Sequence, residues 1–168
     1  MDILEYLQKA GGVARSAQLL QAGFSRRDLL RLREFGANQP RRGVFVLPGC
    51  DKDYQAAIRH NGRLSCASAA AHYGLWLRQT PSRLHLACNH GHGSGFVRHR
   101  TVRFEGHPSL PVAAVEDVAL HALGCLPPPA STAIATSAVR LHGVSPELLA
   151  RELWADRSGT ALRALREL

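Results

Sequence analysis

Residues 21–36 read QAGFSRRDLLRLREFG, and this stretch decides how the first part of the chain folds. Ser25 is a typical N-cap residue, and Asp28 stands three positions later, where its side chain can return the hydrogen bond in a capping box. Phe24, before the cap, can pack on Leu29 one turn into the helix. The glycine that closes the stretch is suited to the position after a helix end. The stretch therefore predicts a helix that begins after Ser25.

The predicted helix separates apolar from cationic side chains. Leu29 and Leu30 define its inward side, with Leu32 at the margin. Arg27 and Arg31 are four residues apart and so share the outward side. Arginines in a first turn, beside free backbone N–H groups, suit a helix that enters the major groove of DNA. The candidate DNA contacts on this helix are its cap and three arginines: Ser25, Arg26, Arg27 and Arg31.

Two short helices are predicted before this one and a hairpin after it. The first spans residues 2–10 and ends at a glycine pair, and the second is capped by Ser16. The four-residue link 21–24 is the short turn that joins two crossed helices in a helix-turn-helix. Residues 38–47 predict a β-hairpin with an arginine-arginine-glycine tip, and Pro40 places its first strand at a sheet edge. A basic hairpin suits phosphates or a minor groove, so this part predicts a winged helix-turn-helix. The remaining candidate DNA contacts are Arg15, Ser16, Arg41 and Arg42.

Positive charge is concentrated in the same part of the chain. The 168 residues carry a net charge of +8, and residues 15–42 hold seven arginines against two acidic residues, a net +5. A GC-rich genome that encodes arginine in place of lysine would explain the composition but not this position. The concentration is typical of a module that contacts DNA phosphates. A shorter basic run, which could extend the DNA contact or form a solvated strand edge, consists of Arg98, Arg100 and Arg103.

The rest of the chain predicts a mixed, mainly helical region. Two strands are predicted, at residues 83–88 and at 96–105, the second as a strand or a hairpin arm. Caps and apolar periodicity predict helices at residues 51–61, 65–76, 111–123, 131–141, 145–154 and from 160 onward. The predicted fold class is α+β. We expect a winged helix-turn-helix domain at 1–50 and a mixed domain, mainly helical with a small β-sheet, at 51–168.

Strings along nearly the whole chain resemble the AbiE-type antitoxin family of type IV toxin–antitoxin systems. They are GGVA at 11–14, AGFSRR at 22–27, RRGVFVLPG at 41–49, LSCASA at 64–69 with His72, Gly74, Leu75 and Trp76 after it, RLHL at 83–86 and VAAVED at 112–117. The resemblance implies a winged helix and an antitoxin domain that neutralises a nucleotidyltransferase-like toxin and represses its own operon. Relatives of this subtype often continue into a domain similar to very-short-patch repair nucleases, and this chain stops at Leu168, about where that domain would begin. The sequence departs from the family at 38–40 and at 88–93, where relatives are more basic.

No motif in the sequence predicts catalysis. A restriction-type nuclease needs an acidic residue followed by an acid-x-Lys string, and neither lysine of the chain stands in one. Glu116 and Asp117 face different ways on a helix and are expected to complement the dipole at its start. Cys88, His90 and His92 alternate, but a structural zinc site usually needs four ligands, so a glycine-histidine turn is expected instead. We therefore predict a non-enzyme with no cofactor and no metal.

The remaining composition bears on compartment and burial. The four cysteines lie far apart, without a C-x-x-C pair, and are expected to be small buried thiols in a reducing compartment. No apolar run is long enough to cross a membrane, and acidic residues near the N-terminus argue against a signal peptide. We therefore expect a cytoplasmic protein. Trp76 and Trp154 are expected to be buried.

These observations predict a sequence-specific DNA-binding protein that acts as antitoxin and transcriptional autorepressor of a toxin–antitoxin operon. The expected partners are double-stranded DNA of its own promoter and a nucleotidyltransferase-like toxin, with no membrane partner. A monomer or weak dimer is expected. Two alternatives remain open: a stand-alone or phage-borne regulator without a toxin, and a toxin-neutralising interaction module with little DNA binding.

Overall fold

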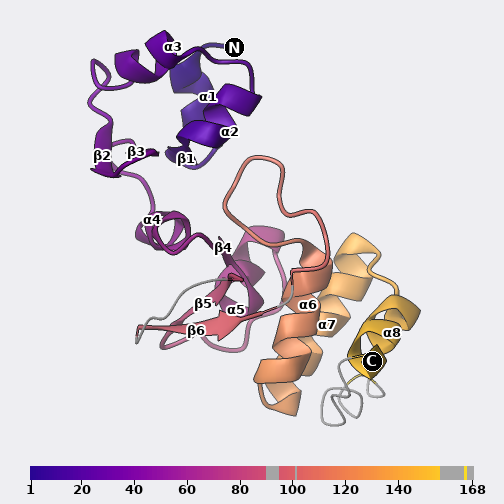
Figure 1. The fold of residues 1–168 in the computed structure, drawn as a ribbon. Coiled ribbons are helices and arrows are strands. Elements are labelled where there is room, and N and C mark those ends of the chain that lie inside the picture. Colours follow the sequence, from indigo (N-terminus) through magenta and orange to yellow (C-terminus); the bar gives the residue numbers. More distant parts are fainter. Residues whose placement is uncertain (90–94, 101, 156–164, 166–168) are drawn as a thin grey trace. The chain divides into compact units, whose positions relative to one another are not determined.

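The computed structural model describes residues 1–89, 95–100, 102–155 and 165, and these residues form an α+β fold. The chain divides into two compact units. The first comprises Met1–Arg63 with His107–Pro111, and the second comprises Leu64–Gly106 with Val112–Leu168. Both units contain helices and short strands, which confirms the mixed α+β class that the sequence predicts (Figure 1).

The first unit combines short helices with one small antiparallel sheet. Its elements are α1 (Ile3–Lys9), β1 (Val13–Arg15), α2 (Ser16–Gln21), α3 (Arg26–Arg31), β2 (Asn38–Arg41), β3 (Val44–Val46) and α4 (Lys52–Arg59). The strand order is β1-β3-β2, which leaves β2 at an edge, as Pro40 predicts. The expected hairpin is formed by β2 and β3, and Gly43 in its turn has a φ of +76°, which glycine adopts without strain. The sequence analysis missed β1, which is only three residues long.

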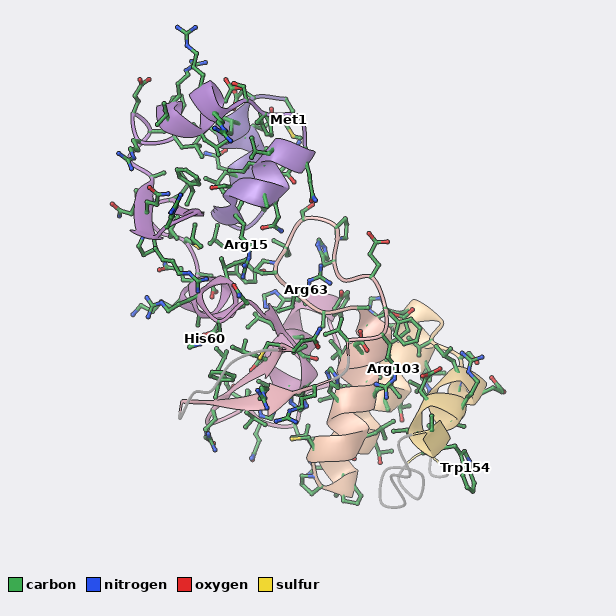
Figure 2. The ribbon with its side chains drawn as sticks, in the orientation of Figure 1. Met1, Arg15, His60, Arg63, Arg103 and Trp154 are labelled. Atoms are coloured by element: carbon green, nitrogen blue, oxygen red, sulfur yellow. The ribbon has the colours of Figure 1, made fainter. Side chains whose placement is uncertain are left out.

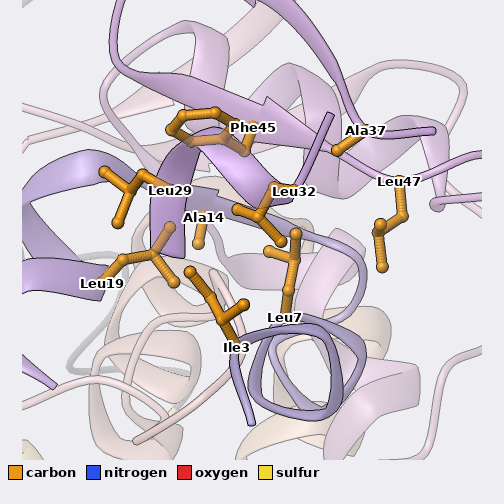
Figure 3. Packing of buried hydrophobic residues seen from close by; sticks show 9 residues of the cluster. All are labelled: Ile3, Leu7, Ala14, Leu19, Leu29, Leu32, Ala37, Phe45 and Leu47. Carbon is orange, nitrogen blue, oxygen red and sulfur yellow. The ribbon is translucent and has the colours of Figure 1, made fainter. Parts of the chain in front are cut away.

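The core of the first unit contains residues from α1, α2, α3 and the sheet (Figure 3). Leu29 and Leu32 of the α3 segment both pack into it, and Leu32 has no exposed surface. Leu30 is 66% exposed, so its predicted inward position is wrong. Residues three apart share a helix face, whereas adjacent residues differ by about 100°, so the pair Leu29 and Leu32 turns Leu30 outward. The buried cluster consists of Ile3, Leu7, Ala14, Leu19, Leu29, Leu32, Ala37, Phe45 and Leu47.

Two further details of this unit concern the residues that cap α2 and α4. Ser16 is the first residue of α2 rather than its cap, because Arg15 takes the N-cap position and its N–H donates to Oε1 of Gln18 (2.9 Å). The side chain of Asp51 caps α4. Because α4 packs against β1 and β3, the first compact unit extends beyond residue 50, where the sequence analysis placed a domain boundary.

The second unit combines a small sheet with the longer helices. Its elements are β4 (Arg63–Leu64, which begins in the first unit), α5 (Cys66–Ala70), a 3₁₀ turn η1 (Ala71–Tyr73), β5 (Leu84–Ala87), β6 (Phe96–His99), α6 (Val115–Cys125), α7 (Pro128–His142) and α8 (Pro146–Ala155). The strand order is β4-β5-β6, and β5 and β6 are parallel, with His85 opposite Val97 and Ala87 opposite His99. The central helix α6 packs against α5, α7 and α8.

Several expected elements of this unit have other bounds. Because β6 ends at His99 and runs parallel to β5, the alternative of a hairpin arm at 96–105 is wrong. The helix expected at 65–76 gives way to η1, and the chain turns at Gly74, whose φ is +62°. Ser65 does not cap that helix, because its hydroxyl is hydrogen bonded to Nδ1 of His121 (2.7 Å).

The residues at the starts of α7 and α8 explain where these two helices begin. The start of α7 is Pro128, since proline fits the first turn of a helix, where its missing N–H would have no partner. The hydroxyl of Ser145 accepts a hydrogen bond from the N–H of Leu148 (3.1 Å) and caps α8, as the sequence predicts. The helix expected from residue 160 onward lies outside the described residues.

The exposure of several side chains differs from expectation. Trp76 and Trp154 are 47% and 67% exposed, so the prediction of buried tryptophans is wrong. The guanidinium of Arg140 lies 5.8 Å from the ring centre of Trp76, and Figure 2 shows Trp154 on α8.

Cysteine burial is also mixed: Cys66 and Cys88 are buried, Cys50 is half-buried and Cys125 is exposed. Among the described helices, none has the length and apolar character needed to cross a membrane.

Candidate nucleic-acid interface

The start of α3 is held by the predicted capping box. The hydroxyl of Ser25 accepts a hydrogen bond from the backbone N–H of Asp28 (3.2 Å). The Asp28 carboxylate accepts hydrogen bonds from the backbone N–H and the hydroxyl of Ser25, at 2.9 and 2.7 Å. Phe24 packs against the buried cluster and meets the ring of Tyr6 edge to face, with centroids 5.3 Å apart. These contacts fix the start of the helix relative to the core.

The hydrogen bonds from Ser25 lower the pKa of Asp28 below its ordinary value, and the charges of Arg31 and Arg27 add to the effect. A carboxylate with a lowered folded pKa stabilises the fold above its unfolded pKa, about 3.9, and this stabilisation is lost as the pH falls through the folded pKa. Because the side chain of Ser25 caps α3, we expect Ser25→Ala to cost about 1 kcal/mol of stability at pH 7, measured by urea denaturation. The difference from wild type should shrink below about pH 4. Ser25→Asn keeps a capping side chain and is the control; an equal cost for both variants would contradict the capping role.

The arginines of α3 are exposed beside this cap. Arg26, Arg27 and Arg31 lie on the surface of the first unit. Within the described part of the chain, their guanidinium groups form no hydrogen bond or ion pair with the protein. Leu30, exposed between them in sequence, adds an apolar side chain to the same helix. The helix therefore offers cationic donors and a small apolar surface to a partner.

Two other predicted contacts, Arg15 and Arg41, bind the backbone of the first unit. Nη2 of Arg15 donates to the carbonyl of Ile58 (2.8 Å), and Nη1 of Arg41 donates to the carbonyl of Arg59 (2.7 Å); Figure 2 labels Arg15. The last carbonyls of a helix have no partner within it and carry partial negative charge, so cations there stabilise the helix end. Partial burial lowers the pKa of Arg15, and the charge of Arg41 adds to this. These two arginines hold the C-terminal end of α4.

The turn of the hairpin lies against the start of α2. The backbone N–H of Ser16 donates to the carbonyl of Gly43 (2.9 Å), so this N–H already has a partner within the protein. Arg42, in the same turn, is exposed, and its guanidinium has no hydrogen bond or ion pair with another described residue. Of the two arginines at the tip of the hairpin, Arg42 is therefore the one whose side chain is available to a partner.

The second basic run lies in the second unit and is largely engaged there. Arg103 is half-buried and forms an ion pair with Glu152 (3.1 Å), and its N–H donates to the Asp117 carboxylate. Arg98 is also half-buried, and Arg100 is exposed. Asp117 is fully buried, and burial raises its pKa, although the N–H groups of Phe104 and Arg103 act in the opposite direction. The sequence predicts that this carboxylate complements a helix dipole. In the structure it also holds the backbone of residues 103–104 through hydrogen bonds.

A group of cysteines and histidines, which the sequence analysis did not connect, lies inside the second unit. Cys66, His85, His99 and Cys125 each place one donor atom within 4.8 Å of the others. Burial lowers the pKa of both imidazoles, to about 3 for His99, so both are neutral near pH 7. The hydrogen bond between the two thiols raises the pKa of Cys66 and lowers that of Cys125 to about 7. These four residues are far apart in the sequence, without the short spacing that would predict a metal site.

Of the three ligand candidates considered from the sequence, Cys88 is not a member of this group. Cys88 is buried at the end of β5, and its N–H donates to the carbonyl of His99 (3.0 Å). His90 and His92 lie outside the described residues.

Comparison with known proteins yields little about function. No protein-family model matches the chain, and no curated protein matches it. Among solved structures, it is similar to the RV2827C protein from Mycobacterium tuberculosis, with 19% identity over 96% of this chain and 77% of that one, and a TM-score of 0.43. A likeness at this level carries no functional argument, so the resemblance to AbiE-type antitoxins stays a prediction.

Proposed function

We propose that the first unit is a winged helix-turn-helix that binds double-stranded DNA. The order α1-β1-α2-α3-β2-β3 and the antiparallel sheet β1-β3-β2 support this assignment, in which α3 is the recognition helix and the β2-β3 hairpin the wing. One observation carries the proposal: Arg26, Arg27 and Arg31 are exposed on one short helix, and their guanidinium groups form no hydrogen bond or ion pair with another described residue. Uncommitted arginines on a surface helix match the electrostatic requirement of a DNA contact.

The proposed interface assigns different tasks to the arginines. Those of α3 enter the major groove, where a guanidinium can donate two hydrogen bonds to one guanine edge. Arg42 at the hairpin turn contacts a phosphate or the minor groove. Arg15 and Arg41 are bonded to the carbonyls of Ile58 and Arg59, and in this proposal they support the interface without touching DNA.

Salt dependence tests this proposal on the full chain. If Arg26, Arg27, Arg31 and Arg42 all displace counterions from phosphates, the slope of log K against log salt is about −3.6, because each phosphate contact contributes about −0.9; contacts to base edges make the slope shallower. Affinity for a promoter duplex, measured by fluorescence anisotropy, should then fall about 150-fold between 50 and 200 mM salt. A random duplex of equal length should bind more weakly than the promoter. Absence of binding at 50 mM salt, or a slope near zero, would contradict a DNA-binding role.

At the level of the operon, we propose an antitoxin that represses its own promoter and binds a nucleotidyltransferase-like toxin. The resemblance of sequence strings supports this part. A reporter fused to the upstream region should be repressed by the protein, and co-expression should rescue growth from the product of a neighbouring toxin gene. Repression without rescue would favour a stand-alone regulator, and rescue without repression would favour an interaction module.

A further inference from the structure

The Cys66, His85, His99 and Cys125 group has the composition of a structural metal centre. Its donor atoms lie within 4.8 Å of one another and come from four different elements: α5, β5, β6 and α6. Two thiols and two imidazoles are a donor set that Zn²⁺ takes in closed tetrahedral sites. Cys66, His85 and His99 are buried, so water is kept from three of the four donors.

The fold explains how residues distant in sequence meet here. In the parallel ladder, His85 faces Val97 and Ala87 faces His99, so the two histidines lie on the same face of the sheet. Cys66 is the first residue of α5, which packs against β5, and Cys125 is the last residue of α6, which packs against α5. Cys66 has a φ of +50°, in the left-handed region that side chains rarely adopt. Such strained positions cluster at ligand sites, where the surrounding structure enforces them.

Two of the distances between donor atoms are close to those of a tetrahedral ion. Zinc bonds of about 2.05 Å to nitrogen and 2.3 Å to sulfur place two nitrogens about 3.3 Å apart and a nitrogen and a sulfur about 3.6 Å apart. Here Nδ1 of His85 and Nε2 of His99 are 3.0 Å apart, and Sγ of Cys125 is 4.0 Å from Nδ1 of His85. Each separation differs from the tetrahedral value by about 0.4 Å or less.

Neighbouring groups position the donors. The ring of His121 stacks on that of His99, with centroids 4.7 Å apart, and its Nδ1 is hydrogen bonded to the hydroxyl of Ser65 (2.7 Å). The hydroxyl of Ser68 accepts a hydrogen bond from the backbone N–H of His85 (2.9 Å). These contacts hold the ring of His99 and the backbone of His85 in place. A cavity of about 330 Å³, lined in part by His99, His121 and Cys125, gives an ion a route from solvent.

We propose that Cys66, His85, His99 and Cys125 bind one Zn²⁺ ion that holds α5, the β5-β6 pair and α6 together. All four ligands come from the protein, so the site is closed and its role is structural rather than catalytic. The group spans residues 66–125, and the ion therefore adds a link between segments that are also joined by packing and by hydrogen bonds. Cys50 and Cys88 are not part of the site.

Metal analysis of the full chain, expressed without a histidine tag and supplied with Zn²⁺ before gel filtration, tests the site. We expect one zinc per chain in the wild type and in Cys50→Ser, and at least a tenfold loss in Cys66→Ser and in His99→Gln. Co²⁺ in place of zinc should give a thiolate-to-metal charge-transfer band that Cys66→Ser loses. Both tryptophans lie in the second unit, so their fluorescence reports its melting. Chelation should lower that Tm by about 5 °C or more.

Several outcomes would overturn the proposal. One is folded wild-type protein, verified by circular dichroism, that retains no stoichiometric zinc. Another is a disulfide between Cys66 and Cys125 in protein prepared under reducing conditions. The variant His90→Ala/His92→Ala must keep its zinc, because loss there with retention in Cys66→Ser would assign the metal to the loop. If Cys66→Ser does not fold, the wild-type stoichiometry and the cobalt spectrum still decide the matter.

Discussion

The variant Arg27→Ala/Arg31→Ala is expected to bind a promoter duplex at least about 30-fold more weakly than the wild type. An arginine that contacts DNA contributes about 1–3 kcal/mol, and the lower figure applied twice gives this factor. Folding should be unaffected, because both side chains are exposed and, among the described residues, form no hydrogen bond or ion pair. The measurement is fluorescence anisotropy at two or more salt concentrations, with circular dichroism to verify folding.

The slope of affinity against salt identifies what the two arginines touch. If both contact phosphates, the slope should decrease by about 1.8, because each released contact accounts for about 0.9. If they read base edges, the slope should change little and discrimination between promoter and random DNA should fall. Either result fits a recognition helix.

A matched control removes the same charge from the second unit. Arg78 and Arg151 are exposed, so Arg78→Ala/Arg151→Ala lowers the net charge equally without touching α3. This control should bind DNA within about threefold of the wild type if the contacts are local. Equal losses in the two double variants would show that affinity follows total charge, and the assignment of α3 as the recognition helix would then be wrong.

Local signals predicted the caps of α3 and α8 but not those of α2 and α5. Ser25 and Asp28 form the expected capping box, and Ser145 caps α8. These motifs could be read from sequence because each depends on residues within one turn of each other. The edge position of β2 was also predictable, since Pro40 has no N–H to donate to a neighbouring strand.

Tertiary contacts explain what the sequence could not show. Arg15 and Arg41 are indistinguishable in sequence from the arginines of α3, but the end of α4 supplies carbonyls that bind them. The cysteine and histidine group meets only because β5 and β6 pair in parallel, with a register that puts His85 and His99 on one face. Its members are spread over residues 66–125, with none of the short spacings by which metal sites are recognised.

Three of the four residues from 29 to 32 are leucines, so the sequence alone could not decide which side of α3 faces the core. Either Leu30 or Leu32 could lie beside Leu29 on the inner face, and the prediction of Leu30 was wrong. The structure buries Leu32 in the cluster with Leu7 and Leu19, and leaves Leu30 at the surface. This choice also sets the rotation of the helix about its axis, which differs by about 80° between the two registers.

Leu32→Ala is therefore expected to destabilise the first unit by about 2–5 kcal/mol, because it removes a fully buried side chain and leaves a cavity. Leu30→Ala, at a site 66% exposed on the same segment, should change stability by no more than about 0.5 kcal/mol. Both tryptophans belong to the second unit, so hydrogen exchange of peptides from residues 1–50, followed by mass spectrometry, is the suitable measurement. Protection should fall across these peptides in Leu32→Ala and remain at the wild-type level in Leu30→Ala. The opposite order would place Leu30 in the core in place of Leu32 and turn the helix by about 80°, which would change the direction in which Arg27 and Arg31 leave the surface.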